Sequence, residues 1–206
     1  MNEINLGEKN EKSVEQIAYE NFESWNDTLQ TKDAKLVAKK YLETGELFGT
    51  VSTKIRQGRE EIAKYFEHFL QINPSGKVVE RKVVKASDNT YIDSGLYNFT
   101  VERNGKKEVV EAMFTYVWGK TKNNDWKILH HHSAVKNEMN QKMTAQSNIN
   151  YEKNNWTNEQ IIGQDAVLKT GFVTHNKKTV RITLIMGVDG DIIIQQVSEI
   201  PEESGV

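Results

Sequence analysis

Residues 107–135 read KEVVEAMFTYVWGKTKNNDWKILHHHSAV, two runs of apolar and aromatic residues separated by a polar segment. Both runs alternate with a period of two and are rich in Val, Phe, Tyr and Trp, a pattern typical of β-strands. The polar segment at 122–125 contains two asparagines and predicts the loop between them. The sequence therefore predicts a pair of long antiparallel strands here.

The residues before this pair extend the same pattern. KVVERKVVKAS at 77–87 and TYIDSGLYNFTVE at 90–102 alternate in the same way, and Asn104-Gly105 is a strong signal for a tight hairpin turn. Four long strands in succession predict an antiparallel meander.

Helical periodicity precedes the strands. Ser13 is a candidate N-cap for VEQIAYENFESWNDTLQ at 14–30, in which apolar residues recur at helical spacing and include Phe22 and Trp25. Thr31 is the expected cap of a second, shorter helix that ends at Gly45 and carries on one side Ala34, Val37, Ala38 and Tyr41.

A third helix is expected in REEIAKYFEHFLQI at 59–72. Acidic residues lie in its first turn, Pro74-Ser75-Gly76 stops it, and a short strand and a turn at Gln57-Gly58 precede it. Its apolar face consists of Ile62, Tyr65, Phe66, Phe69 and Leu70.

Helices followed by a meander predict an α+β fold over residues 13–136, a cone of helices wrapped by a strongly curved antiparallel sheet. Residues 1–12 are expected to be a disordered start, and the polar residues 137–160 a linker or an exposed helix. Residues 161–200 show three further apparent strands, with turns at His175-Asn176 and Asp189-Gly190. Because such a ribbon is barely stable alone, we expect this β-rich extension to dock on the main domain or on a neighbouring subunit.

Composition excludes several classes of function. The chain has 206 residues, 27 basic and 29 acidic, and a formal charge of −2, which favours neither nucleic acid nor an anionic membrane as a partner. It has no cysteine, so disulfides and thiolate chemistry are excluded. The polar N-terminus lacks the apolar segment of a secretory signal, and no apolar run could span a membrane. A cytoplasmic location is expected.

The histidines at 130–132 attract attention because imidazole titrates near neutrality and binds metals. In a strand, His130 and His132 share one side and His131 faces the other. Since no further ligand pattern accompanies the pair, we expect hydrogen bonding within the sheet or across a subunit interface, with no metal and no cofactor.

Strand parity sorts the aromatic residues into an apolar cavity with phenol hydroxyls, which describes a small-ligand pocket and an ordinary core equally well. The only acids near the middle of the strands are Asp93, Glu80 and Glu111, and each is expected on an exposed face. His131, Tyr116 and Tyr97 are weak catalytic candidates. The residues expected to line the pocket are Trp25, Tyr41, Ile62, Phe66, Gly95, Tyr97, Phe99, Phe114, Tyr116, Trp118, His131 and Ser133.

The order of these elements resembles the nuclear transport factor 2-like superfamily, also called SnoaL-like or cystatin-like, over roughly residues 13–136. Three motifs resemble the association (hub) domain of calcium/calmodulin-dependent protein kinase II and bacterial relatives of the SgcJ/EcaC type. They are FESWNDTLQTKD, IRQGREEIAKYF and FTYVWGKTKNNDWKILHHHSAV. The resemblance implies a homo-oligomer, either a dimer or a ring of dimers, with calmodulin binding and a protein kinase as partner.

The resemblance also permits a test of the ligand. It places Ile62 where the hub has a pocket histidine, and Gly95, Tyr116 and Ser133 where animal hubs can carry arginines. None of these is basic, so the carboxylate ligands of the hub are not expected here. The motifs of a kinase domain are absent.

Three functions follow. The first is a non-catalytic, hub-like module with a mostly aromatic pocket that holds a small organic molecule. It would oligomerise through the outer sheet face at Val109, Glu111, Met113, Thr115 and Val117. The second is a SnoaL-like isomerase, dehydratase or hydrolase for a hydrophobic substrate. The third is an adaptor in which residues 165–198 add a strand to another protein.

Overall fold

A computed structural model describes residues 12–50, 52–137, 156–162, 166–175, 178–187 and 192–200. The helices are α1 (Val14–Gln30), α2 (Ala34–Ala38) and α3 (Gly58–Phe69), with a short 3₁₀ turn at Leu70–Ile72. The first six strands are β1 (Tyr41–Phe48), β2 (Ile55–Gln57), β3 (Ser75–Ser87), β4 (Thr90–Arg103), β5 (Lys106–Lys120) and β6 (Trp126–Val135). The last four are β7 (Trp156–Ile162), β8 (Ala166–His175), β9 (Lys178–Gly187) and β10 (Ile192–Glu199).

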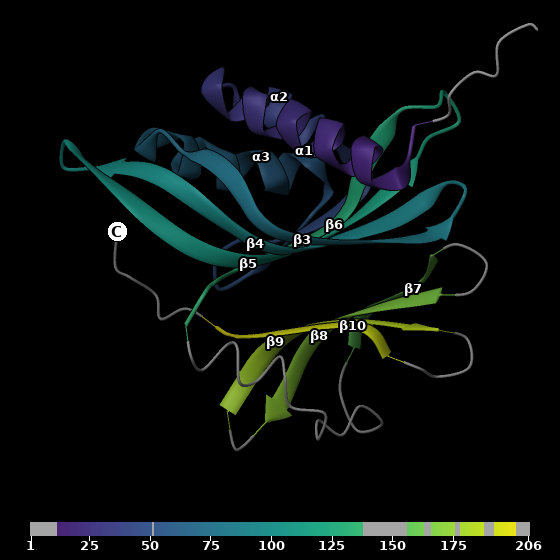
Figure 1. The fold of residues 1–206 in the computed structure, drawn as a ribbon. Coiled ribbons are helices and arrows are strands. Elements are labelled where there is room, and N and C mark those ends of the chain that lie inside the picture. Colours follow the sequence, from purple (N-terminus) through teal and green to yellow (C-terminus); the bar gives the residue numbers. More distant parts are fainter. Residues whose placement is uncertain are drawn as a thin grey trace, which may run out of the picture.

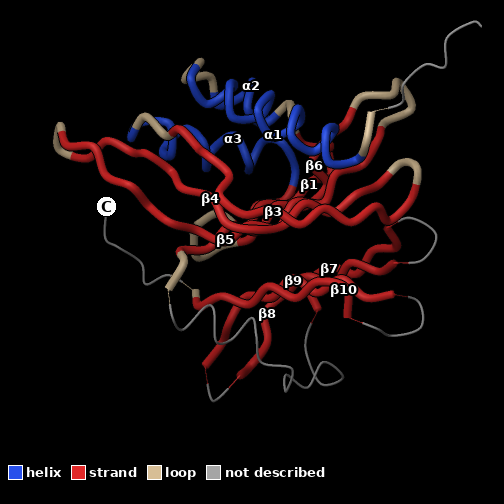
Figure 2. The backbone as a smooth tube through the Cα atoms, viewed as in Figure 1, coloured by secondary structure: helices blue, strands red, loops and turns tan. Residues whose placement is uncertain are grey.

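These elements form three layers. The first sheet has the order β2-β1-β6-β5-β4-β3, in which only the β1–β6 pair is parallel. The helices pack on one of its faces, called here the inner face, and the second sheet, with the order β10-β9-β8-β7, lies on the outer face (Figure 1 and Figure 2). The first sheet is therefore covered on both sides.

Helix α1 forms where the sequence predicts it. The Ser13 side chain accepts the N–H of Gln16 at 3.2 Å, and Phe22 and Trp25 are buried against the first sheet. The Asn26 amide bonds both backbone groups of Gly76, at 3.0 Å and 2.8 Å, and fixes α1 to the start of β3. The helix is held by packing and by this side-chain clamp.

The second helix is shorter than expected. Asp33 caps α2 by accepting the N–H groups of Lys35 and Leu36, while Thr31 bonds back to the carbonyl of Thr28. The prediction that Tyr41 lies on this helix is wrong, because Tyr41 begins β1 and pairs in parallel with β6 beside Ile128. Pairing with a distant strand overrides the local helical spacing.

The four-stranded meander is confirmed as β3–β6. Asn104 and Gly105 have φ of 52° and 72°, the left-handed values that a tight hairpin turn requires. Gly95 is needed for a different reason: a Cβ atom there would lie 1.9 Å from the Glu80 carbonyl oxygen, where β3 carries an irregularity between Val78 and Glu80.

The C-terminal part has four strands where the sequence indicated three. It begins at Trp156, within the segment 137–160 that was expected to be a linker or helix. The rest of that segment, from 138 to 155, lies outside the described residues, as do residues 1–11 and the expected turn positions at Asn176, Asp189 and Gly190. The near face of this second sheet packs on the outer face of the first.

Candidate functional site

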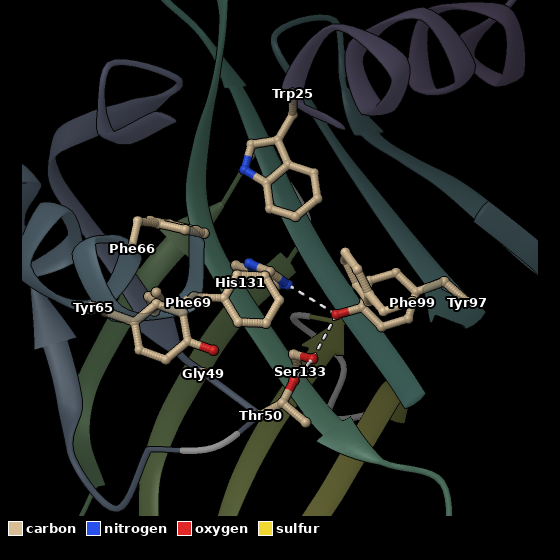
Figure 3. Close-up of a pocket in the computed structure, with 11 residues that line it drawn as sticks. Trp25, Gly49, Thr50, Tyr65, Phe66, Phe69, Tyr97, Phe99, His131 and Ser133 are labelled. Carbon is tan, nitrogen blue, oxygen red and sulfur yellow. Dashed lines mark hydrogen bonds between the residues drawn. The ribbon is translucent and has the colours of Figure 1, made fainter. Parts of the chain in front are cut away.

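A chain of hydrogen bonds runs through the aromatic core on the inner face. His131 Nδ1 lies 2.9 Å from the Tyr41 hydroxyl, and Nε2 lies 3.4 Å from the Tyr97 hydroxyl. Tyr97 donates to the Ser133 hydroxyl at 2.5 Å, and Ser133 bonds Thr50 (Figure 3). Since Tyr97 uses its proton on Ser133, the consistent arrangement has Nε2–H of His131 donating to Tyr97 and Tyr41 donating to Nδ1.

Every side chain in this hydrogen-bond network is neutral near pH 7. Burial lowers the pKa of His131 well below its usual value, and the neighbouring His130 adds to the effect. Burial likewise raises the pKa values of Tyr41, Tyr97 and Tyr116. His131 also stacks on Tyr116 at 4.0 Å between ring centroids. The structure thus brings His131, Tyr97 and Tyr116 together as neutral groups in a closed core.

The cavity beside this hydrogen-bond network is very small. Its volume of about 10 Å³ is that of a single water molecule. It lies between α1, α3 and the strands β1, β4 and β6 (Figure 3). Its lining consists of Trp25, Leu47, Gly49, Thr50, Tyr65, Phe66, Phe69, Tyr97, Phe99, His131 and Ser133.

This lining differs from the expected one. The expected residues at the cavity are Trp25, Phe66, Tyr97, Phe99, His131 and Ser133. The others do not line it: Gly95 is a backbone contact of β3, and the rest are buried in the surrounding core, namely Tyr41, Ile62, Phe114, Tyr116 and Trp118.

Sequence reasoning missed five lining residues. Tyr65 and Phe69 could have been found, because they share the apolar face of α3 with Phe66. Leu47, Gly49 and Thr50 lie at the end of β1 and directly after it, and they reach the cavity because β1 pairs with β6, a contact between positions far apart in sequence. Gly49 lies under the Tyr65 ring, where a Cβ atom would come within 2.4 Å of the ring, so any larger residue would have to displace that ring.

Asp93 is the largest correction. The sequence indicated an exposed face, but this side chain is fully buried in the core, with Oδ1 3.0 Å from Nε of Arg81. Burial raises the pKa of Asp93 to about 7, and Arg81 opposes the rise. Among the described residues, neither carboxyl oxygen of Asp93 has a hydrogen-bond partner, and the Tyr116 hydroxyl has none either. Glu80 and Glu111 are exposed, as expected.

The two outer histidines bind the second sheet. The Thr183 hydroxyl lies 2.8 Å from Nε2 of His130 and 2.9 Å from Nδ1 of His132, and the Ser198 hydroxyl lies 2.8 Å from Nε2 of His132. Burial, with Arg181 nearby, lowers the pKa of His132 well below its usual value. These bonds join the two sheets of one chain, whereas bonds within one sheet or across a subunit interface were expected.

Two charged residues complete this contact. Burial acts to raise the pKa of Glu46, but His130, 3.4 Å away, and Thr170, which donates at 3.0 Å, hold that pKa below its usual value. Arg181 donates to the carbonyls of Gly49 at 2.9 Å, Ser52 at 3.2 Å and Ser133 at 3.5 Å. Gly49 and Ser133 also line the cavity, so Arg181 of the second sheet holds the backbone of two cavity-lining residues in place.

Neither a metal cluster nor a membrane span is found in the described ranges. No group of three or more His, Cys, Asp or Glu side chains there could hold a metal ion. None of the helices among these residues is long and apolar enough to cross a membrane.

Comparison with solved structures defines the class of fold. A nuclear transport factor 2-like superfamily protein from Salmonella enterica is 17% identical, with a TM-score of 0.51, covering 61% of this chain and 92% of that chain. An uncharacterised protein with a cystatin-like fold from Caulobacter vibrioides is 13% identical, with a TM-score of 0.50, covering 61% and 92%. The fold is therefore an α+β fold of the nuclear transport factor 2-like type.

The family follows from closer matches. The family model of the calcium/calmodulin dependent protein kinase II association domain matches residues 14–137. A putative association domain of this kind from Xanthomonas campestris is 34% identical, with a TM-score of 0.60, covering 67% of this chain and 99% of that chain. This chain belongs to the calcium/calmodulin-dependent protein kinase II association domain family, which confirms the resemblance. Comparison with curated proteins gave no match.

Proposed function

We propose that this chain is a self-associating, hub-like module, a homodimer or a ring of dimers, and that it is not an enzyme. The observation that carries the proposal is the packed core, in which aromatic side chains leave a cavity of about 10 Å³. An organic substrate needs a pocket of several hundred Å³. Function then resides on the surface, as the association role of the family implies.

A patch on the outer face of the first sheet suits this role. The hairpin of β4 and β5 reaches past the second sheet at the left of Figure 1. Its strand Lys106–Lys120 presents Val109, whose side chain is 63% exposed. Two residues further along β5, Glu111 lies opposite Asn98 of β4, and Asn98 in turn lies opposite Lys77 of β3. A two-fold axis near Asn98 would set Glu111 of one copy against Lys77 of the other, a self-complementary arrangement.

The test is the mass of the full chain in solution, by sedimentation velocity and light scattering at micromolar concentration. A dimer or larger ring is expected, and Val109→Lys should weaken it because a charge would then enter the contact. Ile161→Lys is the matched control, since Ile161 is also exposed, at 75%, but lies on the second sheet. A monomeric wild type would overturn the proposal.

A catalytic function is the second candidate, and Asp93 is the observation that favours it. Asp93, a carboxyl group with a pKa of about 7 beside Arg81, could accept or donate a proton near neutral pH. Its register partner is Tyr116, whose hydroxyl has no hydrogen bond among the described residues. A SnoaL-like isomerase, dehydratase or hydrolase would use Asp93 on a hydrophobic substrate admitted by an opening of the helical layer.

Thermal-shift screening with small hydrophobic ketones and epoxides tests this candidate. A rise in Tm for the wild type that is lost in Asp93→Asn, with a matched loss of turnover, would support catalysis. No shift in either protein would leave the self-associating module as the function.

Other expectations stay predictions. A small organic ligand, calmodulin binding, a protein kinase partner, a cytoplasmic location and an adaptor role for the C-terminal strands follow from the family resemblance or from composition. Each has its own direct assay, such as co-sedimentation with calmodulin in the presence and absence of calcium.

A further inference from the structure

The second sheet covers the part of the outer face that was expected to bind another protomer. We infer that the strands β7–β10 occupy, within one chain, a surface that fits a second copy of the domain, and so act as a built-in cap on association. The inference rests on the proposed self-association, but the covered surface and the open patch at Val109 can be tested separately.

The apolar part of the contact resembles a protein interior. Ile92 and Val117 of the first sheet are fully buried under the second sheet. Their partners in one continuous cluster are Ile162, Ala166, Leu168, Ile185 and Ile194. Without the cap, this apolar face would be exposed to water, and such faces mark association surfaces.

The polar part gives the contact its register. One hydroxyl, that of Thr183, lies between His130 and His132, and Ser198 takes the remaining nitrogen of His132. A shift of the second sheet by one residue would turn Thr183 and Ser198 away, leaving buried His132 without a partner and buried His130 with Glu46 alone. The match is therefore specific, as at a true interface.

Arg181 extends the contact to the neighbouring loop. Its guanidinium is buried, and although burial lowers its pKa to about 10 it remains charged near pH 7. It donates to the carbonyls of Gly49, Ser52 and Ser133. A planar donor that satisfies three carbonyls of the first domain fastens the cap to it.

The family boundary indicates that the cap is an addition. The association-domain model ends at residue 137, before β7 begins at Trp156. The Xanthomonas campestris domain is covered over 99% of its length by 67% of this chain. A domain of that length leaves the remaining third of this chain without a counterpart, so the cap has no equivalent there.

The chain offers a background-free test because it has no cysteine. Val117→Cys places one thiol under the cap, and its reaction with a maleimide reports the opening of the contact. Ile185→Lys would undock the cap, because a lysine would enter the apolar cluster around Ile92 and Val117. Labelling at low concentration should rise roughly 10- to 100-fold.

Concentration dependence then decides the inference. If the uncovered face binds a second copy, labelling of the Ile185→Lys protein should slow again as its concentration rises, and its mass should exceed that of the wild type. Faster labelling that does not depend on concentration, with unchanged mass, would overturn the cap. Ile161→Lys in the same Val117→Cys background is the matched control and should label as slowly as the parent.

Two checks keep the outcomes distinct. If Ile185→Lys loses its near-ultraviolet tryptophan signal and is unfolded, the milder pair Thr183→Val with Ser198→Ala replaces it. If the wild type is monomeric but the undocked variant associates, the proposed function fails at the open patch while the cap stands. If the wild type assembles and the undocked variant gains nothing, the proposed function stands and the cap fails.

Discussion

Strand β6 presents neighbouring histidines to two different environments. On the inner face, His131 stacks on Tyr116 and bonds tyrosine hydroxyls from β1 and β4. On the outer face, His130 and His132 bond hydroxyls from β9 and β10. The inner environment is built entirely within the family domain, whereas the outer one depends on residues beyond it. The two faces should therefore respond differently to substitution.

The largest expected effect is on the inner face. Trp25→Ala should lower the free energy of unfolding by about 3–5 kcal/mol, because a fully buried indole packed against Phe66, Phe99 and Tyr116 would leave a cavity. Urea denaturation followed by far-ultraviolet circular dichroism measures this loss. Tyr19→Ala, at an exposed position of the same helix, should change stability by less than about 0.5 kcal/mol.

A substitution on the outer face should have a smaller and more local effect. Arg181→Met removes donors to three carbonyls and should cost about 2 kcal/mol. Hydrogen exchange should rise at Gly49, Thr50 and Ser52 and in β9, and stay low in α1. Arg181→Lys should not restore protection, because an ammonium lacks the planar fork. Uniform loss of protection across both sheets would mean that the two faces unfold as one unit.

Acidification should affect both faces. The pKa values of His131 and His132 lie well below their unfolded value near 6.5, so below that pH the unfolded chain binds more protons. The free energy of unfolding should then fall with falling pH, by up to about 1.4 kcal/mol per pH unit for each histidine. Above pH 6.5 neither histidine contributes.

Variants separate the two histidines. His131→Phe and His132→Phe should each reduce by one the number of protons taken up on unfolding, and so flatten the dependence of the free energy of unfolding on pH. Urea denaturation between pH 7.5 and 5 measures this dependence. Asp93 acts in the opposite sense, because its raised pKa costs stability as pH rises from about 4 to about 7. Since Asp93 is common to both proteins, the difference between variant and wild type cancels it. An unchanged slope in either variant would contradict the assignment of that histidine as neutral.

The smallest effect is expected at one shared hydroxyl. Thr183→Val keeps the shape of the side chain but leaves Nε2 of His130 and Nδ1 of His132 without this partner, at a cost of about 1–2 kcal/mol. Thr183→Ser keeps the hydroxyl and is the control. Equal stability of the two variants would show that packing alone holds the second sheet.

Local patterns predicted much of the first sheet and its helices. The alternation along β4 and β5, the Asn104-Gly105 turn and the Ser13 cap each depend on residues close in sequence, and the structure has them. Tyr41 was assigned to a helix because its spacing fits one, while its pairing with β6 joins residues about 90 positions apart. Local spacing carries no information about that contact.

The buried charges were beyond the reach of sequence patterns. Asp93 has the same strand parity as Tyr91 and Tyr97 and is buried, but the sequence analysis followed general burial preferences and expected an exposed position. Arg81 of the adjacent strand makes burial tolerable, and only the register of β3 and β4 shows that the two meet.

By itself the sequence determined the family, the α+β class, and which histidine of β6 faces away from the other two, because motifs and strand parity are local properties. The tertiary structure decided that aromatic side chains fill the core to a water-sized cavity, and that the strands β7–β10 cover part of the outer face through Thr183, Ser198 and Arg181. Packing volumes and partners of buried polar groups arise only when distant segments meet, so no local pattern encodes them.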